Sequence, residues 1–155
     1  MFRISKLTDY ATVVLAAMAR APDERLTASD LAERTGLAQP TVSKLLKRFA
    51  RAGLLTSYRG ARGGYRLAVE PEQISAIDII DRVEGPVAIT ECAQDGCHCE
   101  LEGVCGVGHH WQRINHAIRA ALSEISLADL ASPTAVSLPR LDLRSVVTGV
   151  AEVEQ

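Results

Sequence analysis

Apolar residues recur at helical spacing near the start of the chain. Residues 5–20 carry one apolar stripe, formed by Leu7, Ala11, Val14, Leu15 and Met18. This spacing predicts an amphipathic helix, which should end at Ala21-Pro22. Thr27 and Asp30 then stand three residues apart, as in a capping box. A second helix is therefore expected from Thr27 to about residue 34.

A third helix is expected from Gln39 to about Ala52, with Pro40 in the first turn, where a missing N–H costs nothing. The glycine turn at 35–37 separates it from the second helix, as in a helix-turn-helix motif. Its apolar face carries Val42, Leu45, Leu46 and Phe49. Its opposite face carries Lys44, Lys47, Arg48 and Arg51. One face can pack on a core while the other meets DNA, although a basic face can also simply be solvated.

Two short strands are expected next, at 54–59 and 65–67, with a glycine-rich turn at 60–64 between them. Arg59, Arg62 and Arg66 lie on or beside this turn. Because glycines add little bulk, backbone N–H groups and guanidinium groups there can approach phosphates or a minor groove. A hairpin need not bind anything, but with the cationic helix before it this one indicates a DNA-binding wing.

Helical spacing returns in the second half of the chain. Ile74, Ile77, Ile80 and Val83 predict a helix to about residue 84, where Gly85-Pro86 ends it. A long helix is expected over roughly 109–127, where the apolar residues are Trp111, Ile114, Ala117, Ile118, Ala121, Leu122 and Ile125. Its wide stripe comes late in the chain, with little left to cover it, which favours dimerisation over packing on its own domain.

We therefore predict a mainly α fold: a winged helix-turn-helix with a small β-hairpin wing and a long C-terminal dimerisation helix. The expected parts are a DNA-binding domain over 1–84, a cysteine-rich loop over 85–108, a dimerisation helix over 109–131 and a weakly structured tail over 132–155.

Charge is distributed unevenly along the 155 residues. The net charge is -2, yet residues 25–66 carry nine Lys or Arg against Asp30 and Glu33, a local charge of +7. The rest of the chain therefore carries a charge of -9. A basic face can therefore coexist with an acidic average. No apolar run approaches the roughly 20 residues that span a bilayer. We expect a cytoplasmic protein without membrane association, in which thiols stay reduced.

All four cysteines fall within 14 positions, at Cys92, Cys97, Cys99 and Cys105. The spacings of four, one and five intervening residues differ from the paired knuckles of a zinc site. They fit an iron–sulfur cluster better, since its ligands come from a longer loop. Zinc and a thiol redox switch remain the alternatives. A dithiol enzyme would need a general base or a nucleotide loop, and because the sequence shows neither we expect no enzyme.

These residues resemble the IscR/NsrR-type iron–sulfur transcriptional regulators, the winged-helix Rrf-type family, over about residues 1–130. The resemblance rests on Leu7-Thr-Asp-Tyr-Ala11, Leu31-Ala32, the stretch 40–46, the wing motif Arg59-Gly-Ala-Arg-Gly-Gly-Tyr65 and the cysteine loop. The regulators of the Suf cluster-assembly operon look most similar, through Thr90-Glu-Cys92, Cys99-Glu-Leu-Glu-Gly103, Cys105-Gly and His110-Trp111-Gln-Arg-Ile-Asn115.

The resemblance implies a homodimer in which Cys92, Cys99 and Cys105 hold an iron–sulfur cluster. A 2Fe–2S cluster is favoured, with 4Fe–4S as the alternative. Cys97 is then an additional or alternative ligand. The fourth ligand in the family is either an acidic residue of the first helix of the opposite subunit, here Asp9, or a histidine after the third cysteine. Gly108 occupies that histidine position here, so His109 or His110 would have to serve.

The predicted function is that of a dimeric repressor or activator, with a repressor favoured, that binds a roughly palindromic DNA operator. It is expected to sense cluster status and to control iron–sulfur assembly genes. Alternatives are a nitric-oxide or redox sensor of the same family and a zinc-bound winged-helix regulator. Base edges would be read by Gln39, Thr41, Ser43 and Lys44. Phosphates or the minor groove would be held by Lys47, Arg48, Arg51, Arg59 and Arg62. Pro40, Gly63, Gly64 and Tyr65 complete the predicted interface.

Overall fold

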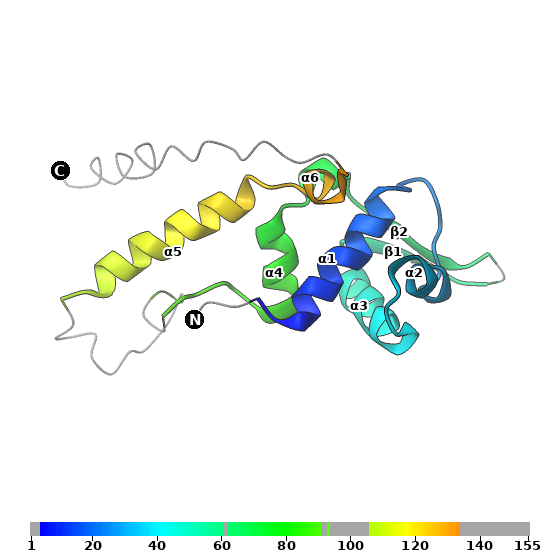
Figure 1. Cartoon of the computed structure of the whole chain (residues 1–155), viewed down its shortest axis with the longest axis horizontal. Helices are drawn as coiled ribbons and strands as arrows, with labels where there is room; N and C mark the ends of the chain where they lie inside the picture. Colours follow the sequence, from blue (N-terminus) through cyan, green and yellow to red (C-terminus); the bar gives the residue numbers. More distant parts are fainter. Residues whose placement is uncertain (1–3, 61, 91–92, 94–105, 134–155) are drawn as a thin grey trace.

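The computed structural model describes residues 4–60, 62–90, 93 and 106–133. The elements in chain order are α1 (Lys6–Ala19), α2 (Ala28–Thr35), α3 (Gln39–Arg51), β1 (Leu55–Tyr58), β2 (Gly64–Leu67), the 3-10 turn η1 (Pro71–Gln73), α4 (Ala76–Glu84), α5 (Gly108–Ser123) and α6 (Leu127–Ala131). In Figure 1, α1 to α3 and the hairpin form one end of the molecule, and α5 extends away from them beyond α4. The predicted mainly α winged-helix fold is confirmed.

The three N-terminal helices form as the apolar pattern predicts. Ser5 caps α1 by accepting a hydrogen bond from the Thr8 N–H, and Ala11, Val14 and Leu15 on its apolar stripe are fully buried. The predicted capping box of Thr27 and Asp30 is present in both directions at the start of α2. The four apolar residues predicted for the inner face of α3 are all buried, which leaves its cationic face outward.

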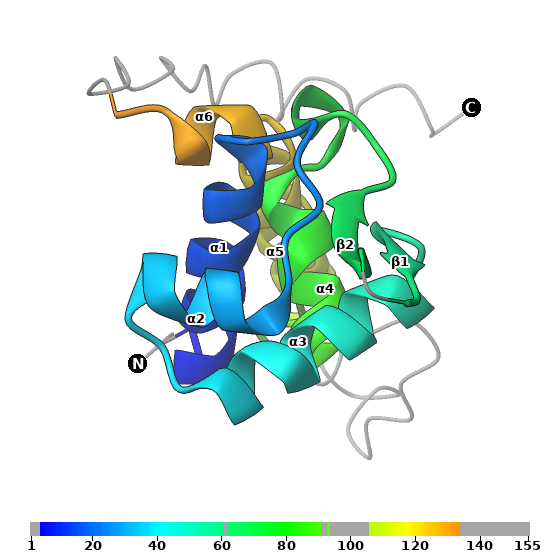
Figure 2. The ribbon, with the colours of Figure 1, turned by 90° about the vertical axis from the view of Figure 1, so that its right-hand side faces the viewer.

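The hairpin is a two-stranded antiparallel sheet, whose register pairs Leu55 with Leu67 at one end and Tyr58 with Gly64 at the other. The loop between α1 and α2 adds a bridge to it, because Leu26 and Tyr65 exchange two backbone hydrogen bonds of 3.0 and 2.8 Å. A Cβ at Gly64 would come within 3.0 Å of the Leu26 carbonyl oxygen, and Gly64 has a φ of +146°. Only glycine permits this close approach. The hairpin thus lies beside α3 and is tied to the α1–α2 loop (Figure 2).

The helix expected from Ile74 begins two residues later. Residues Pro71–Gln73 form the turn η1, and Ser75 caps α4 through a capping box with Asp78. The later start has a local cause. The Ser75 hydroxyl accepts a hydrogen bond from the Asp78 N–H, so Ser75 is the N-cap and the helix begins at the next residue. The predicted end at Glu84 is confirmed, and Gly85 follows with a φ of +98°.

The single long helix expected over roughly 109–127, and with it a dimerisation helix over 109–131, requires correction. The helix α5 ends at Ser123, and Ser126 then caps the separate short helix α6 through Asp129. The cap residues of α4 and α6 pair as a β-bridge, with Ala76 N–H donating to the Ile125 carbonyl at 2.8 Å. Leu127 is fully buried in the main core. The chain therefore returns after α5 to the core that contains α1, α3 and the hairpin instead of continuing away from it.

Candidate functional site

The face of α3 away from the core and the tip of the hairpin form one cationic surface. Its exposed basic side chains are Lys44, Lys47, Arg51, Arg59 and Arg62. Within the described ranges the ion pairs are made by four other arginines, Arg34, Arg66, Arg82 and Arg119. No carboxylate that the structure describes therefore neutralises the cationic surface, which suits it to bind phosphates.

The first turn of α3 places the predicted base-reading residues on its outer side. Gln39, Pro40 and Lys44 are exposed, whereas Thr41 and Ser43 are half-buried. Ala38 at the N-cap makes no side-chain cap. Short polar side chains at the start of such a helix can reach base edges in a major groove, where direct readout occurs.

Two arginines that the sequence associated with this surface are held by the protein itself. The Nε of Arg48 donates to the Arg82 carbonyl at 2.7 Å, so Arg48 fastens α3 to α4. Arg66 lies within β2, away from the tip, and donates to the Pro22 carbonyl at 3.0 Å and to Asp23 at 2.9 Å. These bonds stabilise the arrangement of α3, the wing and the α1–α2 loop.

Arg25 was not identified from the sequence, yet it lies on the wing. Its guanidinium stacks on the Tyr58 ring at 4.2 Å from the ring centroid. No local pattern reveals this contact, because the two residues lie on different elements.

In the turn of the hairpin, a Cβ at Gly63 would meet the Tyr58 carbonyl oxygen at 2.8 Å and the Gly60 carbonyl oxygen at 2.9 Å. Backbone packing therefore explains a glycine at position 63 whether or not DNA contacts it.

Some of the predicted metal ligands are among the described residues and others are not. Cys92, Cys97, Cys99 and Cys105 are outside the described residues, whereas Asp9 and His109 are exposed on α1 and in the first turn of α5. Among the described residues alone, no group of three or more His, Cys, Asp or Glu could hold a metal ion.

Asp9 lies at an open groove of about 590 Å³ whose exposed lining is mainly apolar. The groove runs between α1, α4, α6 and the end of α5, and its other lining residues are Ile4, Lys6, Thr8, Thr12, Ala76, Ile80, Leu122, Ile125 and Leu130. An exposed carboxylate beside apolar surface of this size could contact a second chain.

The start of α1 is fastened to the end of α4, directly before the cysteine-rich segment. Glu84 accepts hydrogen bonds from the hydroxyl of the buried Thr8 and from the Ser5 N–H, the latter at 3.1 Å. These bonds, chiefly the one from Thr8, hold the pKa of Glu84 below its ordinary value. The carboxylate therefore remains ionised and keeps α1 and α4 together under neutral conditions.

No helix among the described residues is long and apolar enough to cross a bilayer.

Comparison with known proteins agrees with the fold. The model of the Rrf2 family, described as iron-dependent transcriptional regulators, matches residues 4–133. The HTH-type transcriptional regulator CymR of Bacillus subtilis (strain 168) is 33% identical over 133 residues, which cover 85% of this chain and 91% of CymR.

Solved structures show the same similarity. The structure of CymR, the global cysteine regulator of B. subtilis, superposes with a TM-score of 0.68 at 32% identity, covering 87% of this chain and all of that one. IscR of T. potens gives a TM-score of 0.61 at 29% identity, covering 83% and 85%. Staphylococcus aureus CymR in an oxidized form gives 0.64 at 28% identity, covering 86% and 99%.

Proposed function

The chain belongs to the Rrf2 family of iron-dependent transcriptional regulators, and from this premise we propose that it senses iron–sulfur cluster status and controls cluster-assembly genes. Members of the family regulate transcription and are not enzymes. What remains to be assigned is the signal. The proposal is that a cluster bound by the cysteine-rich segment sets the affinity of the winged helix for its operator, in the cytoplasm.

One observation carries the sensing part of the proposal: all four cysteines of the chain lie within positions 92–105. Soft thiolate ligands select iron–sulfur clusters, zinc or copper(I), and the wide spacing favours a cluster. We assign Cys92, Cys99 and Cys105 as ligands, with Cys97 as an alternative. When bound, a cluster supplies a redox-sensitive link between parts of the chain that are distant in sequence.

The fourth ligand in this proposal is Asp9 of the partner subunit, with His109 as the alternative. Asp9 fits because its carboxylate is exposed at an apolar groove that a second subunit could cover. His109 fits because it stands in the first turn of α5, four residues after Cys105. A carboxylate is a weaker ligand for iron than a thiolate, so a cluster held by Asp9 would be labile, which suits a sensor.

The DNA-binding part assigns two roles within the cationic surface. Gln39, Thr41, Ser43 and Lys44 at the start of α3 would read base edges. Phosphates or the minor groove would be held by Lys47, Arg51, Arg59 and Arg62. The protein would bind DNA as a homodimer formed through α5. Three large apolar side chains are exposed there, Val107 at the N-cap and Trp111 and Ile114 on the helix. Two identical heads then require an operator with two similar half-sites.

Purification without oxygen tests the proposal. Wild-type protein should be brown, contain iron and acid-labile sulfide, and show visible thiolate-to-iron absorption. Cys92→Ser, Cys99→Ser and Cys105→Ser should each abolish the colour, whereas Cys97→Ser should keep it. Loss of colour in Cys97→Ser would instead make Cys97 one of the ligands. Colourless protein with stoichiometric zinc would overturn the cluster and leave the DNA-binding role intact.

A second candidate is a sensor that responds through its thiols alone. It is favoured by the similarity to S. aureus CymR, a structure of which was solved in an oxidized form. In that case oxidation of the metal-free protein should change operator affinity, and a reductant should restore it. A cluster sensor should lose this response once the cluster is removed.

A further inference from the structure

The loop between α1 and α2 runs along the β2 edge of the hairpin and brings Arg25 onto it. Leu26 forms a backbone bridge with β2, so the loop pairs with the hairpin at this point in the manner of a further strand. Arg66 of β2 holds the loop a second time, through the Pro22 carbonyl and Asp23. Arg25 lies between these two attachments, which fix its backbone relative to the wing.

The side chain of Arg25 reaches across β2 to the neighbouring strand β1. Its guanidinium carbon lies 4.2 Å from the centroid of the Tyr58 ring. Tyr58 is paired with Gly64 of β2, which has no side chain to stand between the loop and β1. A Cβ at Gly64 would also come within 3.0 Å of the Leu26 carbonyl oxygen. Gly64 therefore permits both the close passage of the loop and the stack of Arg25 on Tyr58.

The stack leaves the charge of Arg25 without a counter-charge. The two carboxylates before it, Asp23 and Glu24, are each paired with a different arginine, Arg66 and Arg34. Within the described part of the chain no carboxylate pairs with Arg25, and its side chain is exposed. An aromatic ring attracts a cation without cancelling its charge, and a guanidinium that stacks by its face keeps its N–H donors at the edge. Arg25 is therefore suited to bind an anion.

We propose that Arg25, held on the Tyr58 ring, is a further DNA contact that binds a backbone phosphate beside the wing. Tyr58 directly precedes Arg59, so the stack places Arg25 next to the cations of the hairpin turn. The inference rests on the DNA-binding part of the proposed function and extends the cationic surface to the α1–α2 loop. A guanidinium that is oriented before binding loses less conformational freedom when it meets the phosphate, so the ring strengthens the contact.

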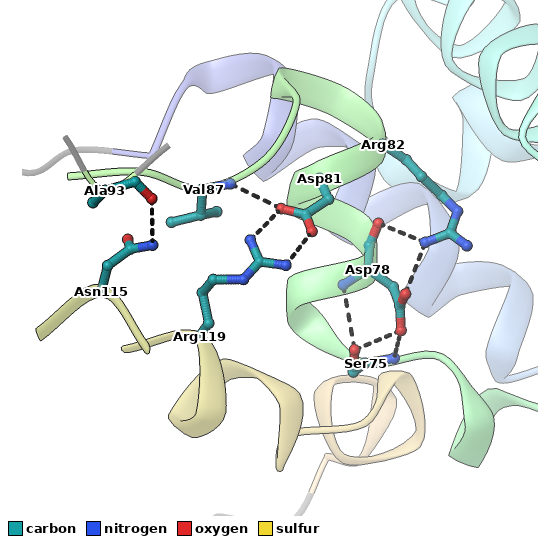
Figure 3. Close-up of polar contacts among 8 residues, drawn as sticks. All are labelled: Ser75, Asp78, Asp81, Arg82, Val87, Ala93, Asn115 and Arg119. Carbon is teal, nitrogen blue, oxygen red and sulfur yellow. Dashed lines mark hydrogen bonds and ion pairs between the residues drawn. The ribbon is translucent and has the colours of Figure 1, made fainter. Parts of the chain in front are cut away.

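The test measures binding of the full chain to a labelled duplex of arbitrary sequence by fluorescence anisotropy at several salt concentrations. Arg25→Gln removes one phosphate contact from each protomer, so the slope of log K against log salt should become less steep by about 2 in a dimer. Arg25→Lys keeps the charge but stacks less well on the ring, so it should keep the slope and weaken binding at every salt concentration. Arg82→Gln is the charge-matched control and should keep the slope, because Arg82 pairs with Asp78 on α4 (Figure 3).

Two variants of Tyr58 test the role of the ring. Tyr58→Phe keeps the stack and should bind DNA as the wild type does, whereas Tyr58→Leu removes the stack and should weaken binding. In an Arg25→Gln background, Tyr58→Leu should have no further effect, because the ring acts only through the arginine. Equal binding by wild type and Tyr58→Leu, or an undiminished effect of Tyr58→Leu without Arg25, would overturn the role of the ring.

The salt slope separates a phosphate contact from a structural role. If Arg25→Gln keeps the wild-type slope, the phosphate contact is refuted even where affinity falls, because an arginine that only braces the loop changes affinity alone. A partly unfolded variant would likewise lose active protein without a change of slope, so the slope remains decisive. If Arg59→Gln/Arg62→Gln also keeps the wild-type slope, the wing does not bind phosphates, and the DNA-binding part of the proposed function fails with it. Neither measurement needs a bound cluster.

Discussion

Replacing the two wing-tip arginines should weaken DNA binding in a manner that depends on salt. Arg59 and Arg62 are exposed, and no described carboxylate pairs with either of them. A cation that contacts a phosphate releases condensed counterions, so each contact makes binding more sensitive to salt. The double variant Arg59→Gln/Arg62→Gln should therefore lose affinity mostly at low ionic strength.

The structure sets the size of the effect. Besides Arg25, four exposed cations of each protomer are assigned to phosphates, Lys47, Arg51, Arg59 and Arg62. Through these four a dimer would make about eight phosphate contacts, which corresponds to a slope of log K against log salt of about -7. Removing two arginines from each protomer should reduce this slope to about -4. Between 50 and 200 mM salt, wild-type affinity should then fall by a factor on the order of 10⁴ and that of the variant by a factor on the order of 10². The contact proposed for Arg25 adds equally to both slopes and leaves their difference unchanged.

Fluorescence anisotropy with a labelled duplex of arbitrary sequence suffices, because the phosphate contribution does not depend on sequence. The charge-matched control is Arg34→Gln/Arg82→Gln, whose arginines pair with Glu24 and Asp78 outside the cationic surface. It changes net charge equally but should leave the slope nearly unchanged. If the wing variant keeps the wild-type slope, or if the control shifts it equally, the assignment of the wing to phosphates is wrong.

Three further predictions concern the scaffold. Gly64→Ala should lower the free energy of unfolding by about 1–3 kcal/mol in urea, because its Cβ would press on the Leu26 backbone at a positive φ; unchanged stability would show that the loop can move aside. Ser126→Ala should cost about 1 kcal/mol in the same assay, because Ser126 caps α6, whereas Ser123→Ala, whose hydroxyl only donates back to Ala120, should cost less. The lowered pKa of Glu84 means that its stabilising contribution is present above its ordinary value of 4.5 and is lost as the pH falls through the folded value. Glu84→Gln should therefore make thermal stability less dependent on pH in that acidic range, and an unchanged dependence would contradict the latch to Thr8.

The sequence predicted the N-terminal half well because its signals are local. The stripe of α1, the Thr27 capping box and the apolar face of α3 each depend on residues within four positions of one another. The glycine-rich turn of the hairpin is an equally local signal. Helix position and strand pairing follow directly from such patterns.

The second half was predicted less well, since two cap signals were overlooked. Ser75 with Asp78 and Ser126 with Asp129 have the same three-residue spacing as Thr27 and Asp30, the pair that located α2. Reading them would have begun α4 at Ala76 and separated α6 from α5. Apolar periodicity alone missed the break because Ile125 and Leu127 lie close to the helical spacing that precedes them.

The contacts beside the cysteine-rich segment could not be found from local patterns at all. Asp81 and Arg119, which form an ion pair between α4 and α5, are 38 positions apart. Asn115, whose amide donates to the Ala93 carbonyl, is 22 positions from Ala93, and Arg48 and Arg82 are 34 apart. A single charged or amide residue on a helix carries no information about its distant partner. Such pairs become visible only when the fold brings the elements together.

The joint between α4 and α5 gives these contacts their importance in the proposed dimer. Asn115 is the single buried residue among those of α5, and a helix of this length is only marginally stable on its own. The helix must therefore be supported by a partner on one side and by α4 on the other, through the Asp81–Arg119 pair and the small cluster around Val87. Since α4 also holds α3 through Arg48, the distance between the two recognition helices depends on how α5 sits on α4. In the proposed dimer, a change at Asp81 or Arg119 would act directly on this joint and so alter the fit to two half-sites.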